Sequence, residues 1–245
     1  MPYDKLKELA LSEGISVFGA GYIEDLRPHF DALLPEQTEG LSYGISLGVR
    51  VSDSVLKGVI TGPTRHYLHH YKMLNFLLDQ TALKLTLSIQ AMGYKALPIP
   101  ASQIIDWGKQ TAHLSHKMIG LRTGIGWLGR NNLLVHPEFG SKIRLATVLT
   151  DMPLKNPPSP PFEKIPPNPP FSKGGNGGIY EGKAKEFPDA QNCGSCRRCI
   201  EICPVSAIGE THMDWNKAAC LEKLKYFAKV YSVGQYICGL CVKVC

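Results

Sequence analysis

Apolar residues recur at helical spacing in the middle of the first 150 residues. The stretch 70–93 has this pattern and stops at Gly93, so it predicts a helix that ends there. Residues 94–100, "YKALPIP", then read as a short buried strand. The run 102–122 is again polar and apolar at helical spacing and predicts a second helix.

Several shorter apolar runs have the composition of strands. Residues 16–21 and 43–49, "SVFGAG" and "YGISLGV", predict two buried strands near the N-terminus. Residues 131–151 predict two more strands around the turn 137–141, "PEFGS". Helices and strands mixed in this way predict a layered fold of the α/β (α+β) class.

A proline- and glycine-rich segment divides the chain. Eight prolines and four glycines fall within residues 157–178, a density at which no packed element forms. We therefore expect three parts: an α/β domain at 1–154, a disordered linker or insertion at 155–187, and a second domain at 188–245.

All eight cysteines lie after residue 192. With no apolar signal-peptide centre at the N-terminus, the expected compartment is the cytoplasm, where thiols stay reduced and a cluster of them indicates a metal site. The stretch "CGSCRRCIEICP" is C-x2-C-x2-C-x3-C-P, the run that binds a [4Fe–4S] cluster with three thiolates and sends the fourth cysteine to a neighbouring cluster. A second, partial run, "CGLCVKVC", closes the sequence.

These two runs predict two [4Fe–4S] clusters. Ferredoxin-type pairing gives a first set and a second set of four ligands, which together use every thiol. The first set is Cys193, Cys196, Cys199 and Cys245; the second is Cys203, Cys220, Cys238 and Cys241. The alternative is a pair of zinc sites, which rarely have three cysteines at x2 spacing followed by x3-C-P.

The net charge gives little reason to expect a nucleic-acid partner. The formal charge is +6 with every cysteine neutral. Two oxidised clusters at about −2 each would lower it to about +2. Local basic clusters are therefore interpreted as a solvated surface; examples are Arg197 with Arg198, and Lys217, Lys223, Lys225 and Lys229. The sequence also has no apolar run of the length that spans a membrane, so no membrane association is expected.

The loop 123–131, "TGIGWLGRN", contains the G-x-G-x-x-G letters of a dinucleotide site. In such a site the glycines follow a strand and open a helix, whereas here a predicted helix precedes them and a strand follows. NAD or FAD binding is therefore not expected. The glycines indicate either a close approach of the backbone to something flat or bulky, or a tight turn between elements.

The stretch 120–154, "GLRTGIGWLGRNNLLVHPEFGSKIRLATVLTDMPL", followed by the cysteine pattern, resembles the corrinoid-dependent iron–sulfur reductases, which include epoxyqueuosine reductases and reductive dehalogenases. The resemblance covers the chain except the linker. It implies a cobalamin-reductase-like α/β domain followed by a two-cluster ferredoxin-like domain, with cobalamin held base-off and reduced through the clusters. It further implies a low-potential donor such as ferredoxin or flavodoxin, and corrinoid contacts at Gly124, Gly126, Trp127 and Gly129.

The sequence departs from this family at the proton donor. Gln110 occupies the position of the family's acidic residue, and a glutamine cannot deliver a proton as a carboxylic acid does. Asp106, His113 and His116 are the expected substitutes, with the two histidines three residues apart on one predicted helix face. For each histidine the alternative is a hydrogen-bonded structural role. The helical repeats of the tRNA-acting members do not follow the cysteines, so tRNA is an unexpected substrate.

The start of the long predicted helix, "TRHYLHHYKMLN", offers further candidates. In the resembled family this region borders the substrate, which makes Tyr67, His70 and Tyr71 possible active-site residues; an exposed helix surface is the alternative. His66 and His70, four residues apart, could also bind a metal, although a third ligand is missing from the motif.

Three functions remain open. The first is a corrinoid-dependent reductase of an unidentified small molecule. The second is an electron-transfer protein that reduces the corrinoid of another protein, and the third is a ferredoxin module attached to a structural domain.

Overall fold

The computed structural model describes residues 2–30, 32–106, 111–154 and 193–245. Within it the chain forms two compact units, each built from three separate segments. The first unit comprises the described parts of 1–49, 75–125 and 144–187, and the second comprises the described parts of 50–74, 126–143 and 188–245. The expected linker at 155–187 lies outside the described residues. The division of the sequence into three parts therefore stays a prediction.

The first unit is organised by a four-stranded sheet in the order β1-β2-β6-β3. Its strands are β1 (Val17–Tyr22), β2 (Tyr43–Arg50), β6 (Ile143–Thr150) and β3 (Ala96–Ile99). β1 pairs antiparallel with β2 and β3 pairs antiparallel with β6. The two predicted N-terminal strands are therefore confirmed, and the mixed α/β class holds with antiparallel pairs in the sheet.

β3 was expected to be a buried strand, and this was wrong. It lies at the edge of the sheet, and only Ile99 of its four residues is buried. Pro98 explains the position, because proline has no N–H to give to a neighbouring strand and is tolerated only where one side of the strand is unpaired.

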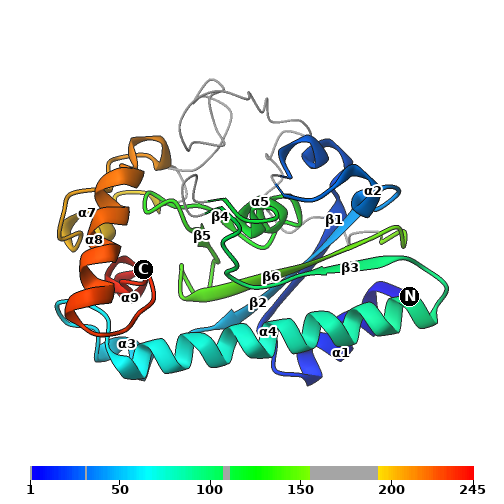
Figure 1. Ribbon diagram of the computed structural model, residues 1–245, viewed down its shortest axis with the longest axis horizontal. Helices are drawn as coiled ribbons and strands as arrows, with labels where there is room; N and C mark the ends of the chain where they lie inside the picture. Colours follow the sequence, from blue (N-terminus) through cyan, green and yellow to red (C-terminus); the bar gives the residue numbers. More distant parts are fainter. Residues whose placement is uncertain (1, 31, 107–110, 155–192) are drawn as a thin grey trace. The chain divides into compact units, whose positions relative to one another are not determined.

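One face of the sheet packs on helices. Figure 1 shows α1 (Pro2–Ser12) and the 27-residue helix α4 (Arg65–Ala91) side by side along this face. Leu78, Leu85 and Ile89 of α4 are fully buried, as the helical spacing predicts. Gly93, with φ of +86°, allows the left-handed turn that ends the helix, so the predicted helix end is confirmed within two residues.

The other face of β1 and β2 is lined with glycines, which allow α5 (His116–Arg122) and the chain after it to approach closely. A Cβ at Gly19 would lie 2.4 Å from Ile125 Cγ2, and a Cβ at Gly44 would lie 3.0 Å from Ile119 Cγ2. The glycines of the "FGAG" and "YGIS" runs are therefore explained by helix–sheet packing.

The helix predicted over 102–122 is much shorter in the structure. Only α5 is helical, and the described part of the segment before it is loop with an isolated bridge between Asp106 and Thr111. Ser102 has φ of +57°, which interrupts any helix there. His113 consequently precedes α5 and does not share a helix face with His116. Gln110 lies outside the described residues.

The two strands predicted over 131–151 exist, but they belong to different sheets. β5 (Leu134–Val135) pairs with β4 (Trp127–Leu128) in a two-stranded sheet of the second unit. β6 belongs to the four-stranded sheet. The turn between β5 and β6 is closed by a bridge between His136 and Gly140, which is where the "PEFGS" turn was expected.

The cysteine-bearing part of the second unit consists of short helices and loops. Its elements are α7 (Arg198–Glu201), η2 (His212–Asp214), α8 (Lys217–Val230) and α9 (Leu240–Val244); α3 (Asp53–Lys57) comes from the earlier segment. The remaining short helices, η1 (Glu24–His29) and α2 (Pro35–Thr38), belong to the first unit. Among the residues that the structure describes, no helix is long and apolar enough to cross a membrane.

Candidate functional site

The eight cysteines are free thiols, and seven of them are half-buried while Cys196 is exposed. Their electrostatic interactions show which of them are neighbours. Burial raises the pKa of the Cys199 thiol, and the thiolates of Cys245, Cys193 and Cys196 raise it further. The four cysteines of the predicted first set therefore lie close together.

The second set shows the same pattern. Burial raises the pKa of Cys220 to about 11, with further increases from the charges of Cys238 and Cys203. Burial likewise raises the pKa of Cys241, followed by the charges of Cys238, Cys220, Cys199 and Cys203. Cys203, Cys220, Cys238 and Cys241 thus form a second neighbourhood, and the interaction of Cys241 with Cys199 links it to the first.

N–H groups point at several of these sulfur atoms. The Ser141 amide donates to Cys245 Sγ and the Ala207 amide donates to Cys203 Sγ, both at 3.2 Å. The backbone amide and the guanidinium of Arg198 donate to Cys196 and lower the pKa of its thiol. Donors of this kind stabilise a cluster-bound thiolate and make the cluster easier to reduce.

No three histidine, cysteine or acidic residues among those described are grouped tightly enough to bind one metal ion. A zinc ion needs its four ligands within about 2.0–2.3 Å of a single point, whereas a cubane distributes four thiolates over four irons. The donors are all thiolates, in two neighbourhoods of four, each supplied with N–H groups. This donor chemistry fits iron–sulfur clusters.

Tyr67 supports the second cysteine run. Gly239, between Cys238 and Cys241, has φ of +88°, and a Cβ there would lie 2.8 Å from the Tyr67 ring. The Tyr67 side chain is buried and packs edge-on against Tyr71, with the ring centroids 6.4 Å apart. Tyr67 therefore contacts the loop that carries Cys238 and Cys241, two cysteines of the predicted second set. Its expected role beside a substrate stays a prediction.

His70 is held by the backbone of the same unit. Its Nε2 accepts the Ser52 amide at 3.0 Å, so the neutral ring carries its proton on Nδ1. Burial lowers the pKa of His70, and the nearby charges of His66 and His69 lower it further. These contacts involve one of the two ring nitrogens of His70 and do not test its expected role as an active-site residue. That role stays a prediction.

The glycine loop packs on its own hairpin. A Cβ at Gly126 would lie 2.2 Å from the Val135 carbonyl oxygen, and a Cβ at Gly129 would lie 2.6 Å from Val135 Cγ2. Gly124 has φ of +70°, which also favours glycine. The tight-turn alternative therefore accounts for these glycines. Trp127, the remaining expected corrinoid contact, is half-buried in β4.

The three expected proton donors have different surroundings. His116 is buried, with Nε2 donating to the Pro100 carbonyl at 3.1 Å and Nδ1 accepting from the Thr147 hydroxyl at 2.8 Å. Burial lowers its pKa to about 4. Both nitrogens are engaged and the ring is neutral, so the structure favours the structural alternative for His116.

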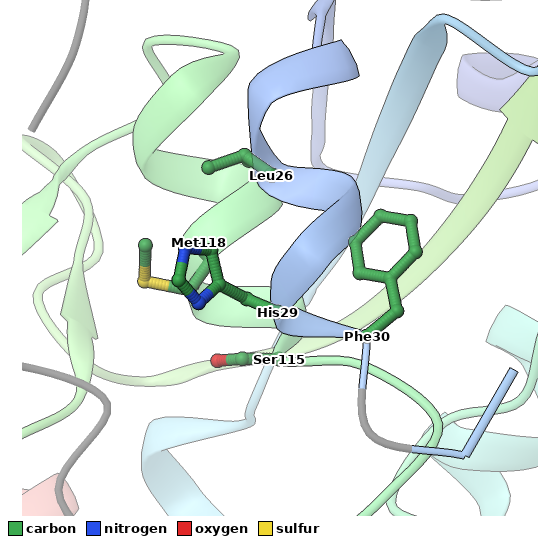
Figure 2. A pocket seen from close by; sticks show the side chains of 5 residues that line it. All are labelled: Leu26, His29, Phe30, Ser115 and Met118. Atoms are coloured by element: carbon green, nitrogen blue, oxygen red, sulfur yellow. The ribbon is translucent and has the colours of Figure 1, made fainter. Parts of the chain in front are cut away.

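His113 and Asp106 remain as donor candidates. The Nδ1 atom of His113 is buried and has no hydrogen-bond partner among the described residues. Asp106 is half-buried and faces Thr111 across the isolated bridge. Neither residue lines the hollow shown in Figure 2, which is bordered by Leu26, His29, Phe30, Ser115 and Met118.

Sequence reasoning missed residues that hold the cysteine loops from a distance along the chain. Lys243 in α9 donates to the carbonyls of Lys57 and Val59, at 3.3 and 2.8 Å. Arg130 donates to the carbonyls of Gly194 and Cys196. The only sequence signal for Arg130 was its place beside Gly129 in the glycine loop.

Comparisons with known proteins bear on this arrangement. No family model matches the sequence. An epoxyqueuosine reductase of Listeria monocytogenes is 30% identical over 144 residues, which are 55% of this chain and 30% of that protein. One from Bacillus anthracis is 33% identical over 121 residues, 49% of this chain and 23% of that protein. The chain thus matches less than a third of the length of these relatives.

Solved structures share the fold. The reductive dehalogenase NpRdhA in complex with 3-bromo-4-hydroxybenzoic acid superposes with a TM-score of 0.67 at 17% identity, covering 98% of this chain and 31% of the dehalogenase. The epoxyqueuosine reductase of Streptococcus thermophilus gives 0.57 at 17% identity, covering 98% of this chain and 64% of that chain.

An epoxyqueuosine reductase solved with an epoxyqueuosine-modified tRNA stem loop also matches, with a TM-score of 0.56 at 16% identity over 99% of this chain and 64% of that chain. The expectation against tRNA is therefore not supported. The resemblance read from the glycine loop and the cysteines is confirmed: this chain has homologues among the epoxyqueuosine reductases and shares the fold of these enzymes and of the corrinoid reductive dehalogenases.

Proposed function

We propose that this protein is an iron–sulfur reductase that passes electrons through two [4Fe–4S] clusters. The observation that carries the proposal is the division of eight cysteines into two neighbourhoods of four, which an interaction between Cys199 and Cys241 joins. Two adjacent clusters provide a route for single electrons, which enter from a low-potential donor such as ferredoxin or flavodoxin.

We further propose cobalamin as the electron acceptor within the protein. One support is the similarity to epoxyqueuosine reductases. Another is the fold shared with a reductive dehalogenase whose structure suggests a mechanism for B12-dependent dehalogenation; the two superpose with a TM-score of 0.68. When bound, a reduced corrinoid supplies a strong nucleophile or one-electron reductant. Gly126 and Gly129 do not add support, because their packing on Val135 explains them.

The chain's own contribution to such a reduction would be a proton. His113 is the favoured donor, because its Nδ1 atom is buried without a hydrogen-bond partner in the described part of the chain, whereas both nitrogens of His116 are engaged. Asp106 is the second choice. The substrate is either a small molecule or a modified nucleoside in RNA.

Anaerobic reconstitution with iron, sulfide and cobalamin tests the proposal. Iron analysis should find about eight irons per chain, and about four would contradict the two-cluster assignment. Visible absorption should show a base-off corrinoid that co-purifies with the protein. Binding of both cofactors, followed by substrate turnover with a chemical reductant and no partner protein, would establish a reductase.

The packing of the glycine loop favours one alternative specifically. If the reconstituted protein holds about eight irons but no corrinoid, two functions remain: an electron-transfer protein that reduces the corrinoid of another protein, and a ferredoxin module attached to a structural domain. Reduction of an added corrinoid protein by the iron-loaded chain would then be the decisive measurement.

A further inference from the structure

Arg130 is a buried cation in the second unit. It follows Gly129 in the glycine loop, and its side chain is 9% exposed. A guanidinium this buried destabilises the fold unless its N–H groups find acceptors, because the charge has lost its hydration.

Its acceptors are three backbone carbonyls. Nε donates to Glu210 O at 2.8 Å, Nη1 donates to Cys196 O at 2.7 Å, and Nη2 donates to Gly194 O at 2.9 Å. The Glu210 carboxylate is 3.9 Å away and half-exposed, and it pairs with Arg197, so it neutralises little of the buried charge. The planar, five-donor guanidinium suits such a multi-point contact.

Two of these carbonyls belong to the loop of the first two cysteines. Because Gly194 O and Cys196 O converge on one rigid group, the curvature of the Cys193–Cys196 loop is fixed from outside. The Cys196 sulfur is left to other donors, the amide and guanidinium of Arg198. The loop thus separates its carbonyls from the sulfur that would face a cluster.

Resting on the cluster assignment above, we propose that Arg130 is a positioning residue for the first cluster. It holds the Cys193–Cys196 loop in its ligating shape, and its buried charge raises the reduction potential of the cluster bound there. Reduction adds an electron to an anionic cluster, so a fixed cation in a medium of low dielectric favours the reduced form.

Three variants of the iron-loaded protein test this inference. Arg130→Met removes the charge and the hydrogen bonds, and Arg130→Lys keeps a charge without the planar fork. Arg197→Met is the matched control. It removes a cation beside the same loop, but the Arg197 side chain is 52% exposed. Iron and sulfide content, iron release to a chelator, and potentiometric titration followed by electron paramagnetic resonance are measured. Cys196→Ala identifies the signal of the first cluster.

Arg130→Met should release iron from the first cluster about 10- to 100-fold faster than the parent. The reason is that loss of an outer-shell partner typically weakens metal binding by about this factor. Any cluster that remains should titrate at a more negative potential, while the second cluster stays unchanged. Arg130→Lys should restore the potential and still release iron faster. Arg197→Met should behave as the parent.

Parental release rates and potentials in Arg130→Met would overturn the inference. If that variant does not fold, Arg130→Lys decides, because a parental release rate there shows that the three-carbonyl contact holds nothing. A parent protein that binds no [4Fe–4S] cluster overturns the proposed function itself, whereas a loaded parent with unaffected variants overturns only the role of Arg130.

Discussion

The two units of this protein are stabilised in different ways. The first unit has a continuous apolar core between a four-stranded sheet and the helices α1 and α4, with fully buried side chains such as Leu6, Ile45, Leu47, Leu85 and Ile89. In residues 193–245 of the second unit the buried apolar residues are few: Ala207, Ile208, Phe227, Val233, Ile237 and Leu240. The other two segments of the second unit do contribute buried apolar side chains, such as Val55, Leu56 and Val135. The contrast therefore concerns the cysteine-bearing segment, which buries few apolar side chains of its own.

Contacts from segments distant in the sequence hold the cysteine-bearing segment of the second unit in place. Arg130 binds the first cysteine loop, Tyr67 packs under Gly239, and Lys243 caps the end of α3. These are polar or ring contacts at defined points, and they orient loops more than they bury surface. A segment that buries so few apolar side chains commonly depends on bound metal for its stability.

Removal of iron should produce the largest difference in stability between the two units. Treating the reconstituted protein with a reductant and chelator should cost the second unit several kcal/mol of unfolding free energy, since metal binding is part of its folding free energy. Hydrogen exchange should show lost protection of α8 amides and retained protection of β6 amides. Equal protection of α8 with and without iron would contradict the contrast.

A cavity in the apolar core should have the opposite effect. Leu85→Ala, at a fully buried position of α4, should lower the free energy of unfolding of the first unit by about 3–4 kcal/mol. Iron content after reconstitution should remain parental. Leu83→Ala, at a position of the same helix that is 46% exposed, is the control and should change stability little.

A substitution in the glycine loop tests whether Gly126 is required by the packing of the loop or by a cofactor. Gly126→Val places a branched side chain against the Val135 carbonyl and should destabilise the second unit by about 2–3 kcal/mol. Thermal unfolding and cobalamin affinity are measured together. A stable variant that has lost cobalamin binding would show that the loop faces the corrinoid after all. Gly58→Ala, with φ of −71° at the end of α3, is the control.

Acid should weaken the first unit through His116. Its pKa is about 4 in the folded protein against 6.5 in the unfolded chain, so the unfolded chain gains a proton first as pH falls. This stability is complete above pH 6.5 and is lost between pH 6.5 and about 4, with a loss of about 2 kcal/mol at pH 5. His116→Asn should flatten this part of the pH dependence of β6 hydrogen exchange. An unchanged slope would argue against a buried neutral ring.

Local signals in the sequence predicted the parts whose cause is local. The helical period of α4 up to Gly93 and the apolar runs of β1 and β2 identified those elements, because burial of one face imposes its period on the residues. The two ligand sets stay a prediction: short spacings place Cys193, Cys196 and Cys199 at one cluster, and ferredoxin-type pairing adds Cys245 from the end of the sequence.

The errors arose where long-range contacts decide. Residues 102–115 have helical spacing but form a loop, with Asp106 bridged to Thr111. The run 131–151 supplies strands to two different sheets, since the partners of each strand come from elsewhere in the chain. Hydrophobic periodicity indicates which positions are buried, but it does not indicate which segment packs against them.

The sequence by itself therefore determined the main secondary structure and predicted the cluster chemistry, both from spacings of a few residues. Only the tertiary structure decided that Val135 requires Gly126, that Thr147 and Pro100 occupy His116, and that Arg130 reaches a cysteine loop 66 residues away. The physical reason is that a hydrogen-bond partner or a close backbone approach is set by where the folded chain returns, which leaves no periodic trace in the residues themselves.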